Sequence, residues 1–427
     1  MRFNTLNEWL SWQESLHSSE IDLGLARIRE VWLRLNPDGA MQCPVITVAG
    51  TNGKGSSVAM LEAIYLAAGY RVGTYTSPHL IRYNERIRLD GAEVDDAALC
   101  DSFERIDQAR SALDSGETSL TYFEFGTLAA LDIFARAHLD VVILEVGLGG
   151  RLDGVNIVDA DVALITTIAL DHADWLGNDR EVIGREKAGI MRQGRPAVCG
   201  DLNPPASIAE VANEVGAQLY LNQKSFGATV QEGQWRWWGK LDDKSRQRDA
   251  LPAPALRGAF QMHNAAAVLT VVELLAERLP LSQSNIREGL ANVAVPGRFQ
   301  VIGGDVPLVL DVAHNPEAAK ALADNLRAWP MPGSTYGIVA MMADKDISAV
   351  FGLLNGVIDE WHVTTVDIPR AASADTLAGL LESPQRHESV GQALAEVKGK
   401  TQPNDRIVVF GSFYTVAEAM QAAYNVG

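Results

Sequence analysis

The stretch from residue 45 to residue 57 has the residue types of a phosphate-binding turn. Gly50, Gly53 and Gly55 surround one lysine, Lys54, directly after the apolar, β-branched run Val45–Ala49 and before a helical pattern. Glycines let the backbone turn tightly, so that several N–H groups converge on an anion with the positive end of the following helix behind them. We therefore predict that this turn holds phosphate and that Lys54 supplies a mobile positive charge.

The turn departs from the strict Walker pattern. That pattern requires a glycine where Val48 stands and a serine or threonine where Gly55 stands. An ordinary glycine-rich turn between a strand and a helix is the alternative, and the motif alone does not decide between the two. The strand signal before the turn and the helix signal after it favour the phosphate site.

A nucleotide enzyme also needs magnesium, which prefers hard oxygen ligands. Ser77 and Glu145 both end apolar strand runs, where a carboxylate is costly unless it is hydrogen-bonded or bound to a cation. We predict both as metal ligands. His172 follows the next strand run; alone it fits a loop histidine, and only the edge shared with Glu145 favours a ligand. Lys187 by itself fits a solvated helix lysine.

Alternating strand and helix signals must position these residues. Helical spacing runs over residues 6–35, from the turn to Gly69, over 123–138, through Lys187 and over 260–278. Strand signals cover residues 72–77, and the runs 140–146 and 161–167 are apolar enough to be buried on both faces of a parallel sheet. Residues 227–240 are typical of a short hairpin whose tryptophans pack in a core. The polar loop 77–86 hangs at a strand end, where α/β proteins place ligands.

The helical pattern breaks at a Pro-Gly pair near Val295–Arg298, where we place a domain boundary. Residues 1–295 are predicted to form an ATP-binding α/β domain with a parallel sheet, and residues 296–427 a smaller C-terminal α/β domain. The second domain has strand signals at 308–312, 336–341 and 406–410. No GxGxxG fingerprint follows any of them, so its shape is Rossmann-like without dinucleotide binding.

Composition excludes several classes of protein. The 427 residues are 47% hydrophobic, enough for two cores, and carry a formal net charge of −18. An acidic chain is a poor ligand for nucleic acid or anionic membranes. Cys43, Cys100 and Cys199 lack the spacing of a disulfide framework or a zinc site. Without a signal-peptide core or a membrane-length apolar run, we expect a cytoplasmic protein.

At this point the ordered motifs resemble a known family, the folylpolyglutamate synthases in the folate branch of the Mur ligases. The matching segments span nearly the whole chain: 50–56, 76–79, 145–153, 171–172, 184–189, 263–264, 296–299 and 311–316. The segments 21–27 and 120–125 look like the pterin-side segments of the bacterial bifunctional members, which are dihydrofolate synthases as well.

The resemblance implies an ATP-dependent amide ligase. It would add L-glutamate to dihydropteroate and further glutamates to reduced folates, through an acyl phosphate. It also implies two Mg²⁺ ions, one held by Ser77 and Glu145 and the other by His172 and a carbamylated Lys187. Lys54, Lys187 and His314 would be the catalytic residues. No nucleic acid, membrane or other macromolecular partner is implied, and we expect a monomer.

The resemblance also assigns binding residues. Those implied for ATP are Gly50, Thr51, Asn52, Gly53, Lys54, Gly55, Ser56, Asn264, Arg298 and Asp311. Those implied for the acceptor and glutamate are Asp22, Leu25, Arg27, Thr121, Phe123, Glu124, Asp153 and Ser412. Phe123 would stack on the pterin. The chain departs from the family at Gly154 and Val155, where Ala-Thr is usual, so a hydroxyl contact at position 155 is in doubt.

Three alternatives remain at this point. A folylpolyglutamate synthase without the dihydrofolate activity would share these motifs. A cell-wall Mur ligase should carry a separate uridine-binding domain before the turn, but only residues 1–44 precede it. A non-enzymatic nucleotide switch gives no reason for Glu145, His172 and Lys187 to accompany the turn.

Overall fold

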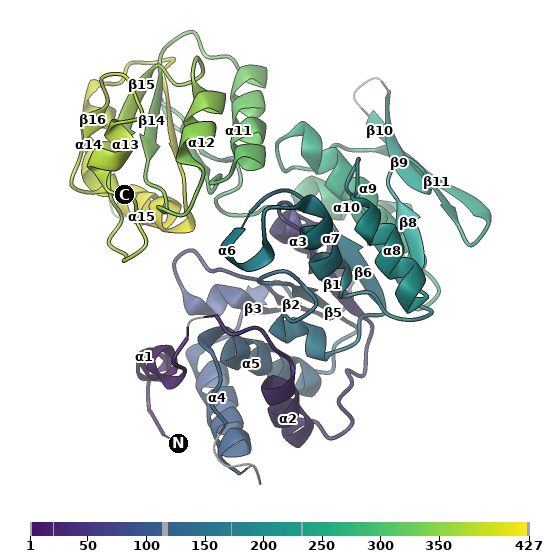
Figure 1. Ribbon diagram of the computed structural model, residues 1–427. Coiled ribbons are helices and arrows are strands. Elements are labelled where there is room, and N and C mark those ends of the chain that lie inside the picture. Colours follow the sequence, from purple (N-terminus) through teal and green to yellow (C-terminus); the bar gives the residue numbers. More distant parts are fainter. Residues whose placement is uncertain (1, 20, 113–117, 172, 232–233, 425–427) are drawn as a thin grey trace. The chain divides into compact units, whose positions relative to one another are not determined.

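The computed structural model describes residues 2–19, 21–112, 118–171, 173–231 and 234–424, in two units (Figure 1). The first unit comprises Met1–Ala255 and Met262–Val293, and the second comprises Leu256–Gln261 and Ala294–Gly427. The chain therefore enters the second unit briefly before it returns to the first. In that short segment the Arg257 guanidinium lies 4.7 Å from the ring centre of Trp329, a contact within the second unit.

The main sheet of the first unit has the parallel core that the apolar runs predict. Strands β2, β5, β1, β6, β7 and β8 pair in parallel, and β3 and β4 add an antiparallel edge. Across the sheet the order is β4 (Ala92–Glu93), β3 (Ile87–Leu89), β2 (Val72–Tyr75), β5 (Val141–Glu145), β1 (Val45–Ala49), β6 (Val162–Ile165), β7 (Pro196–Cys199) and β8 (Gln218–Leu221). All residues of β1 and β5 are buried, as expected for central parallel strands.

Helices cover both faces of this sheet. Alternate strand residues such as Val142 and Leu144 share one core with α1 (Leu6–Leu16), α2 (Ala26–Leu35), α4 (Asp96–Ser111), α5 (Tyr122–Arg136), α7 (Arg180–Ala188) and α8 (Ala206–Val215). Elsewhere in the unit α10 (Gln283–Asn292) packs along α3 (Lys54–Ala67). Helix α9 (Ala259–Leu274) begins within the short segment of the second unit and continues into the first unit. Shorter pieces are α6 (Ala173–Leu176) and the 3₁₀ turns at Tyr83–Arg86 and Gly154–Ile157.

A small antiparallel sheet stands apart from the main one. The predicted hairpin is present as β9 (Phe226–Gln231) and β10 (Gln234–Leu241), and a third strand, β11 (Lys244–Leu251), extends it. The indole N–H of Trp237 donates to the backbone oxygen of Ala266 and to the Thr270 hydroxyl, both on α9. This confirms the packing role of the buried tryptophans. Sequence reasoning missed β11 because most of its residues are polar and exposed.

The second unit is built on one mixed sheet. Its order is β12 (Gln300–Ile302), β13 (Leu308–Asp311), β17 (Arg406–Phe410), β14 (Thr335–Val339), β15 (Glu360–Val363) and β16 (Gln385–Arg386), and only β12 is antiparallel. Five helices accompany it: α11 (Pro316–Ala328), α12 (Ile347–Leu354), α13 (Ala374–Ala378), α14 (Val390–Lys400) and α15 (Phe413–Tyr424). The predicted α/β class holds for both units.

Two further observations concern the chain as described. Cys43, Cys100 and Cys199 are buried and form no disulfide. Among the described residues no helix has the length and apolarity to cross a bilayer.

One close helix contact sets the position of α3, which begins at Lys54. Gly289 on α10 lies against the backbone of Ile64, and a Cβ atom at Gly289 would stand 2.5 Å from the Ile64 Cα. Because Cβ atoms never approach a backbone that closely, only glycine permits this packing distance. The helix of the phosphate turn is thus held by a second helix through a contact that no side chain could replace.

We predict that Gly289→Ala lowers the free energy of unfolding of the first unit by about 2 kcal/mol, since overpacking must push α10 away from α3. Gly352→Ala is the matched control, because Gly352 also lies in a helix but has no heavy atom near its Cβ position. That variant should be neutral or stabilising by up to about 1 kcal/mol. Urea unfolding followed by tryptophan fluorescence measures both, and equal midpoints would contradict the packing account.

Candidate functional site

The glycine turn joins the end of β1 to the start of α3, as predicted. Gly50 and Gly53 have φ values of 150° and 85°, in the region that favours glycine. A Cβ at Gly50 would lie 1.8 Å from the Thr166 hydroxyl, and one at Gly53 would lie 2.9 Å from the Asn264 side-chain oxygen. The glycines are therefore required by conformation and by close neighbours. The second contact also places Asn264, a predicted ATP residue, directly beside the turn.

The residues that follow β6 hold the turn in shape. The Thr51 N–H donates to the Thr167 backbone oxygen at 2.7 Å, and the Asn52 N–H to the Thr167 hydroxyl at 3.2 Å. The Thr166 hydroxyl donates to the Asn52 backbone oxygen at 2.6 Å. These bonds fix the shape of the turn, and the amides of the first turn of α3 are directed at any anion bound there.

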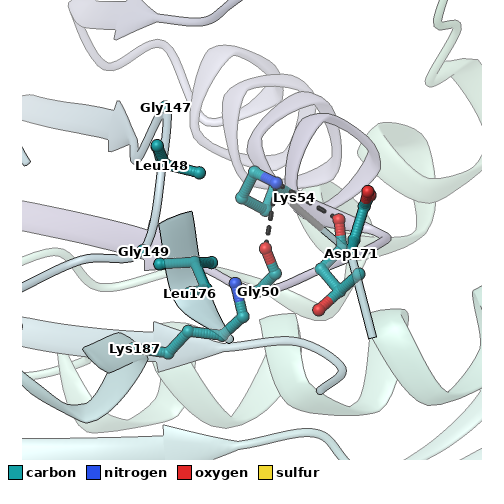
Figure 2. Close-up of a pocket in the computed structure, with 9 residues that line it drawn as sticks. Gly50, Lys54, Gly147, Leu148, Gly149, Asp171, Leu176 and Lys187 are labelled. Carbon is teal, nitrogen blue, oxygen red and sulfur yellow. Dashed lines mark hydrogen bonds between the residues drawn. The ribbon is translucent and has the colours of Figure 1, made fainter. Parts of the chain in front are cut away.

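Lys54 and Lys187 face one pocket with an empty volume of about 270 Å³ (Figure 2). The Lys54 ammonium donates to the backbone oxygens of Gly50 and Thr51 at 2.9 and 3.2 Å, so it lies folded over the turn. The Lys187 side chain extends toward the same turn. The other residues that line the pocket are Gly50, Thr51, Gly147, Leu148, Gly149, Asp171 and Leu176.

Lys187 is a buried lysine rather than a solvated one. Only 3% of it is exposed, so the solvated alternative weighed from the sequence is wrong. Burial, and to a smaller extent the neighbouring Lys54 charge, lower the pKa of Lys187 to about 7. Asp171 and Asp153 raise it, but less than burial lowers it. A large share of the Lys187 amine is therefore neutral at neutral pH.

Glu145 and Ser77 lie at adjacent strand ends, where metal ligands were predicted. Glu145 is 5% exposed and accepts a hydrogen bond from the Ser77 N–H at 3.2 Å. Both Glu145 oxygens lie 3.9 Å from the Cβ position of Gly55, so the carboxylate faces the phosphate turn. A buried carboxylate beside a hydroxyl and a phosphate site fits a divalent cation.

The other predicted metal ligands cannot all be placed. His172 lies outside the described residues. Within the described ranges no three acidic, histidine or cysteine side chains group closely enough to hold a metal ion by themselves. An ion at Glu145 would therefore have to complete its shell with other oxygen ligands, and the phosphate groups of a nucleotide are of this kind.

Beyond Glu145 the same strand end leads to the predicted acceptor residues. Phe123 and Asp153 meet at Gly147, whose Cβ position lies 2.7 Å from the Phe123 ring and 3.3 Å from an Asp153 oxygen. Asp153 accepts hydrogen bonds from the Leu148 and Val155 amides at 2.8 and 3.1 Å. Burial raises the pKa of Asp153 to about 6, against the lowering effect of these amides. Val155 is fully buried, so it offers core packing in place of a hydroxyl.

The remaining acceptor residues of the first unit form a second group. Thr121 caps α5 in a capping box with Glu124. The Arg27 guanidinium donates to Glu124 at 2.9 Å and to Asp22 at 2.5 Å, so hydrogen bonds connect all four residues. Leu25 stands apart from them: it is the N-cap residue of α2 and packs against the main core.

In the second unit the predicted residues lie at the ends of β13 and β17. Asp311 accepts from the Phe299 and Ala313 amides at 2.9 and 2.8 Å. Burial raises the pKa of Asp311, whereas Arg298 lowers it. The Arg298 guanidinium lies 5.2 Å from the ring centre of Phe413, within the same unit.

His314 and Ser412 are held by the backbone around them. His314 Nδ1 lies 2.8 Å from the Val312 backbone oxygen, which sets the orientation of the ring. The Ser412 hydroxyl accepts from the Thr415 N–H at 3.0 Å and lies 2.6 Å from the Thr415 hydroxyl. Ser412 is 5% exposed, so helix capping is the role that its contacts display.

Comparison with known proteins agrees with this geometry. Residues 48–272 match the model of the Mur ligase middle domain, and residues 297–413 match that of the Mur ligase glutamate ligase domain. The dihydrofolate synthase/folylpolyglutamate synthase of Escherichia coli is 46% identical over 97% of this chain and 95% of its own length. The chain belongs to this family of Mur ligases. The Haemophilus influenzae member is 41% identical to the ligase, over 97% of this chain and 96% of its own.

Solved structures extend the agreement to the whole fold. E. coli FolC in complex with DHPP and ADP superposes on the ligase with a TM-score of 0.92 at 44% identity, covering 99% of this chain and 98% of the other. The Yersinia pestis enzyme complexed with AMPPNP and Mn ion gives a TM-score of 0.90 at 48% identity, with the same coverage. The predicted family, fold class and ATP-dependent acid–amino-acid ligase class are thereby confirmed.

Some contributors to the site were not assigned from the sequence. Asp171, Gly147 and Leu148 line the pocket, and Thr166 and Thr167 support the turn. The available signal was the pair of threonines directly after an apolar strand run, because hydroxyls at a parallel strand end can reach the neighbouring loop. The two threonines do not indicate which residues they bind, so only the structure identifies their contacts with residues 50–52.

We predict that Lys54→Ala lowers kcat at least 100-fold, because it removes the charge that the turn directs at phosphate. Lys240→Ala, which removes an exposed lysine from β10 in the same unit, is the control and should keep wild-type turnover. ADP release in a coupled assay measures both variants, and urea unfolding checks that the Lys54 variant remains folded. Turnover of Lys54→Ala within threefold of wild type would contradict the assignment of the turn.

Proposed function

We propose that this ligase adds L-glutamate to dihydropteroate, giving dihydrofolate, and adds further glutamates to reduced folates. The observation that carries the proposal is the spacing on one strand end: Glu145 faces the phosphate turn, and Gly147, two residues later, touches both Phe123 and Asp153. An acceptor held at Gly147 therefore lies close to a nucleotide held at the turn. Solved relatives with bound DHPP and ADP, and with bound AMPPNP and L-glutamate, support these classes of substrate.

The pterin ring is common to both acceptors, so we propose that they share one site. Phe123 offers an aromatic face, and the Asp153 carboxyl offers acceptors to the ring N–H groups. Asp153 is fixed by backbone amides on both sides, which orients it before the ligand binds. Asp22, Leu25, Arg27, Thr121 and Glu124 complete the acceptor side of the proposal.

The reaction would proceed in two steps. The acceptor carboxylate attacks the γ-phosphorus of ATP, which forms an acyl phosphate and releases ADP. The amine of glutamate then attacks the acyl carbon and releases inorganic phosphate. Lys54 and the amides of the turn stabilise the negative charge that develops on the transferred phosphoryl group.

The proposal assigns the remaining residues as follows. Residues 50–56, Asn264, Arg298 and Asp311 would contact ATP, and His314 and Ser412 would contact the acyl phosphate or glutamate. Ser77 and Glu145 would hold one Mg²⁺ ion, and His172 and Lys187 a second. Magnesium in these places would neutralise the triphosphate and bring two anions together. We also propose that the protein is a cytoplasmic monomer and that it has no macromolecular partner.

Turnover with defined acceptors tests the function. Purified protein, Mg·ATP and L-glutamate are supplied with dihydropteroate in one reaction and with tetrahydrofolate in another, and the products are identified by mass spectrometry. We expect glutamylated product from both acceptors, together with stoichiometric ADP. Product from tetrahydrofolate alone would reduce the function to a folylpolyglutamate synthase. Product from neither would contradict the proposal.

We further propose that Lys187 is carbamylated. An ammonium beside Lys54 would repel the cation that Lys187 is expected to help hold. Carbon dioxide adds to a neutral amine to give a carbamate anion and a proton, and the lysine then carries carboxylate oxygens suited to magnesium. The burial of Lys187, which keeps much of its amine neutral, supports this proposal.

We predict that Lys187→Ala loses most turnover and is partly rescued by added acetate or propionate, which supply the missing carboxylate, but not by ethylamine. With ¹³C-labelled bicarbonate, wild-type protein should show a carbamate carbon signal in the NMR spectrum that the variant lacks. Rescue by ethylamine, or fully active wild-type protein without the signal, would show that Lys187 acts as a cation.

A further inference from the structure

Two consecutive residues after β6 have their backbone polar groups bound by side chains instead of a neighbouring strand. The Ile168 N–H donates to Asp201 at 2.7 Å, and the Ile168 backbone oxygen accepts from Arg180 at 2.8 Å. At Ala169 the Thr51 hydroxyl does both, accepting from the N–H at 3.0 Å and donating to the oxygen at 3.1 Å. The chain at 168–169 is thus fixed from two sides.

Asp201 and Arg180 form a single brace. Asp201 follows β7, is 8% exposed and also accepts from the Asn203 N–H at 2.8 Å. Arg180, the first residue of α7, lies 3.4 Å from Asp201 and donates to the Asn203 backbone oxygen at 3.1 Å. A guanidinium can bind two backbone oxygens and a carboxylate at once because its donors form a rigid fork. The brace ties the ends of β6 and β7 to the start of α7.

The segment 168–169 connects this brace to residues that line the pocket. Thr51 is part of the phosphate turn and lines the pocket, and Asp171 lines the same pocket two residues after Ala169. Arg180 also begins the helix that carries Lys187 seven residues later, two turns along the same face. A displacement of the segment 168–169 would therefore change the position of Thr51 relative to Lys187 and Asp171.

We propose that Asp201 and Arg180 are positioning residues for nucleotide binding, acting through Ile168 and Ala169 on Thr51 of the phosphate turn. Neither side chain lines the pocket, so neither is catalytic. The inference rests on the proposed assignment of residues 50–56 to ATP. It goes beyond that assignment, because it names residues outside the pocket that keep the turn in its binding shape.

A purely structural role would give a different result from a positioning role. If the brace only stabilises the fold, its loss lowers stability while the folded protein still binds nucleotide normally. If the brace positions the turn, its removal weakens nucleotide binding. A small misplacement of a binding group raises the dissociation constant on the order of tenfold or more. Acceptor binding at Phe123 and Asp153 should not change in either case.

The test measures the dissociation constant of AMPPNP with Mg²⁺ by calorimetry for Asp201→Asn and Arg180→Ala, at a temperature where urea unfolding shows each to be folded. We expect binding about tenfold weaker for both, with an unchanged dissociation constant for dihydropteroate. Arg185→Ala is the matched control: Arg185 lies on the same helix with similar exposure, but it pairs with Glu210 and Glu214. It should bind AMPPNP as wild type does.

A double-mutant cycle then tests the route of action. Thr51→Val removes the hydroxyl that binds Ala169, so the combined loss in Thr51→Val with Asp201→Asn should be smaller than the product of the two separate losses. The inference would be overturned if the affinity losses of Thr51→Val and Asp201→Asn multiply in the double variant, or if both brace variants bind AMPPNP with wild-type affinity. Lys54→Ala is measured alongside: wild-type affinity in that variant would contradict the phosphate turn itself, whereas weakened binding in Lys54→Ala with normal brace variants would contradict the brace alone.

Discussion

A phosphate-binding turn needs its amides to converge before the anion arrives, and its own backbone cannot meet this requirement alone. In this ligase the residues after β6 meet it. Thr166 and Thr167 bind the backbone of Asn52, and Ala169 binds the hydroxyl of Thr51. Gly50 allows the strand ends to come this close, because any side chain at position 50 would collide with Thr166. The catalytic arrangement therefore depends on two parallel strand ends, held in register by the sheet.

Electrostatics explain why such a turn suits a ligase. The chain carries a net charge of −18, yet two lysines face one small pocket. The Lys54 ammonium at the turn gives a bound anion a local positive site within the negative field of the whole protein. Lys187 lines the same pocket, and its pKa is lowered because burial and the neighbouring Lys54 charge both disfavour its ammonium form. Glu145 lies opposite the turn, where its buried carboxylate fits a divalent cation.

Much of this arrangement could be predicted from the sequence. The β-branched run before Gly50 and the long apolar runs ending at Glu145 and Thr167 follow local rules of strand and turn formation. The motifs in their order then identify the family. These features were accessible because each depends on neighbours in the chain.

Other features depend on contacts between distant segments, and the sequence does not display them. The polar strand β11 owes its place to pairing with β10. Arg180 and Asp201 look like ordinary surface charges until the fold brings them to Ile168. Lys187 looks like a solvated helix lysine, although its helix face is covered. The segment Leu256–Gln261 joins the second unit before the predicted boundary, because its contacts lie there.

The central claim is that the turn directs the γ-phosphoryl group of ATP to the carboxylate of the acceptor. Isotope transfer tests this most directly. Dihydropteroate labelled with ¹⁸O in its carboxylate is converted with Mg·ATP and L-glutamate, and the inorganic phosphate is analysed by mass spectrometry. An acyl phosphate requires one carboxylate oxygen to leave with the phosphate, so we predict one ¹⁸O atom in each phosphate formed. Unlabelled phosphate from a reaction that still yields dihydrofolate would contradict the account.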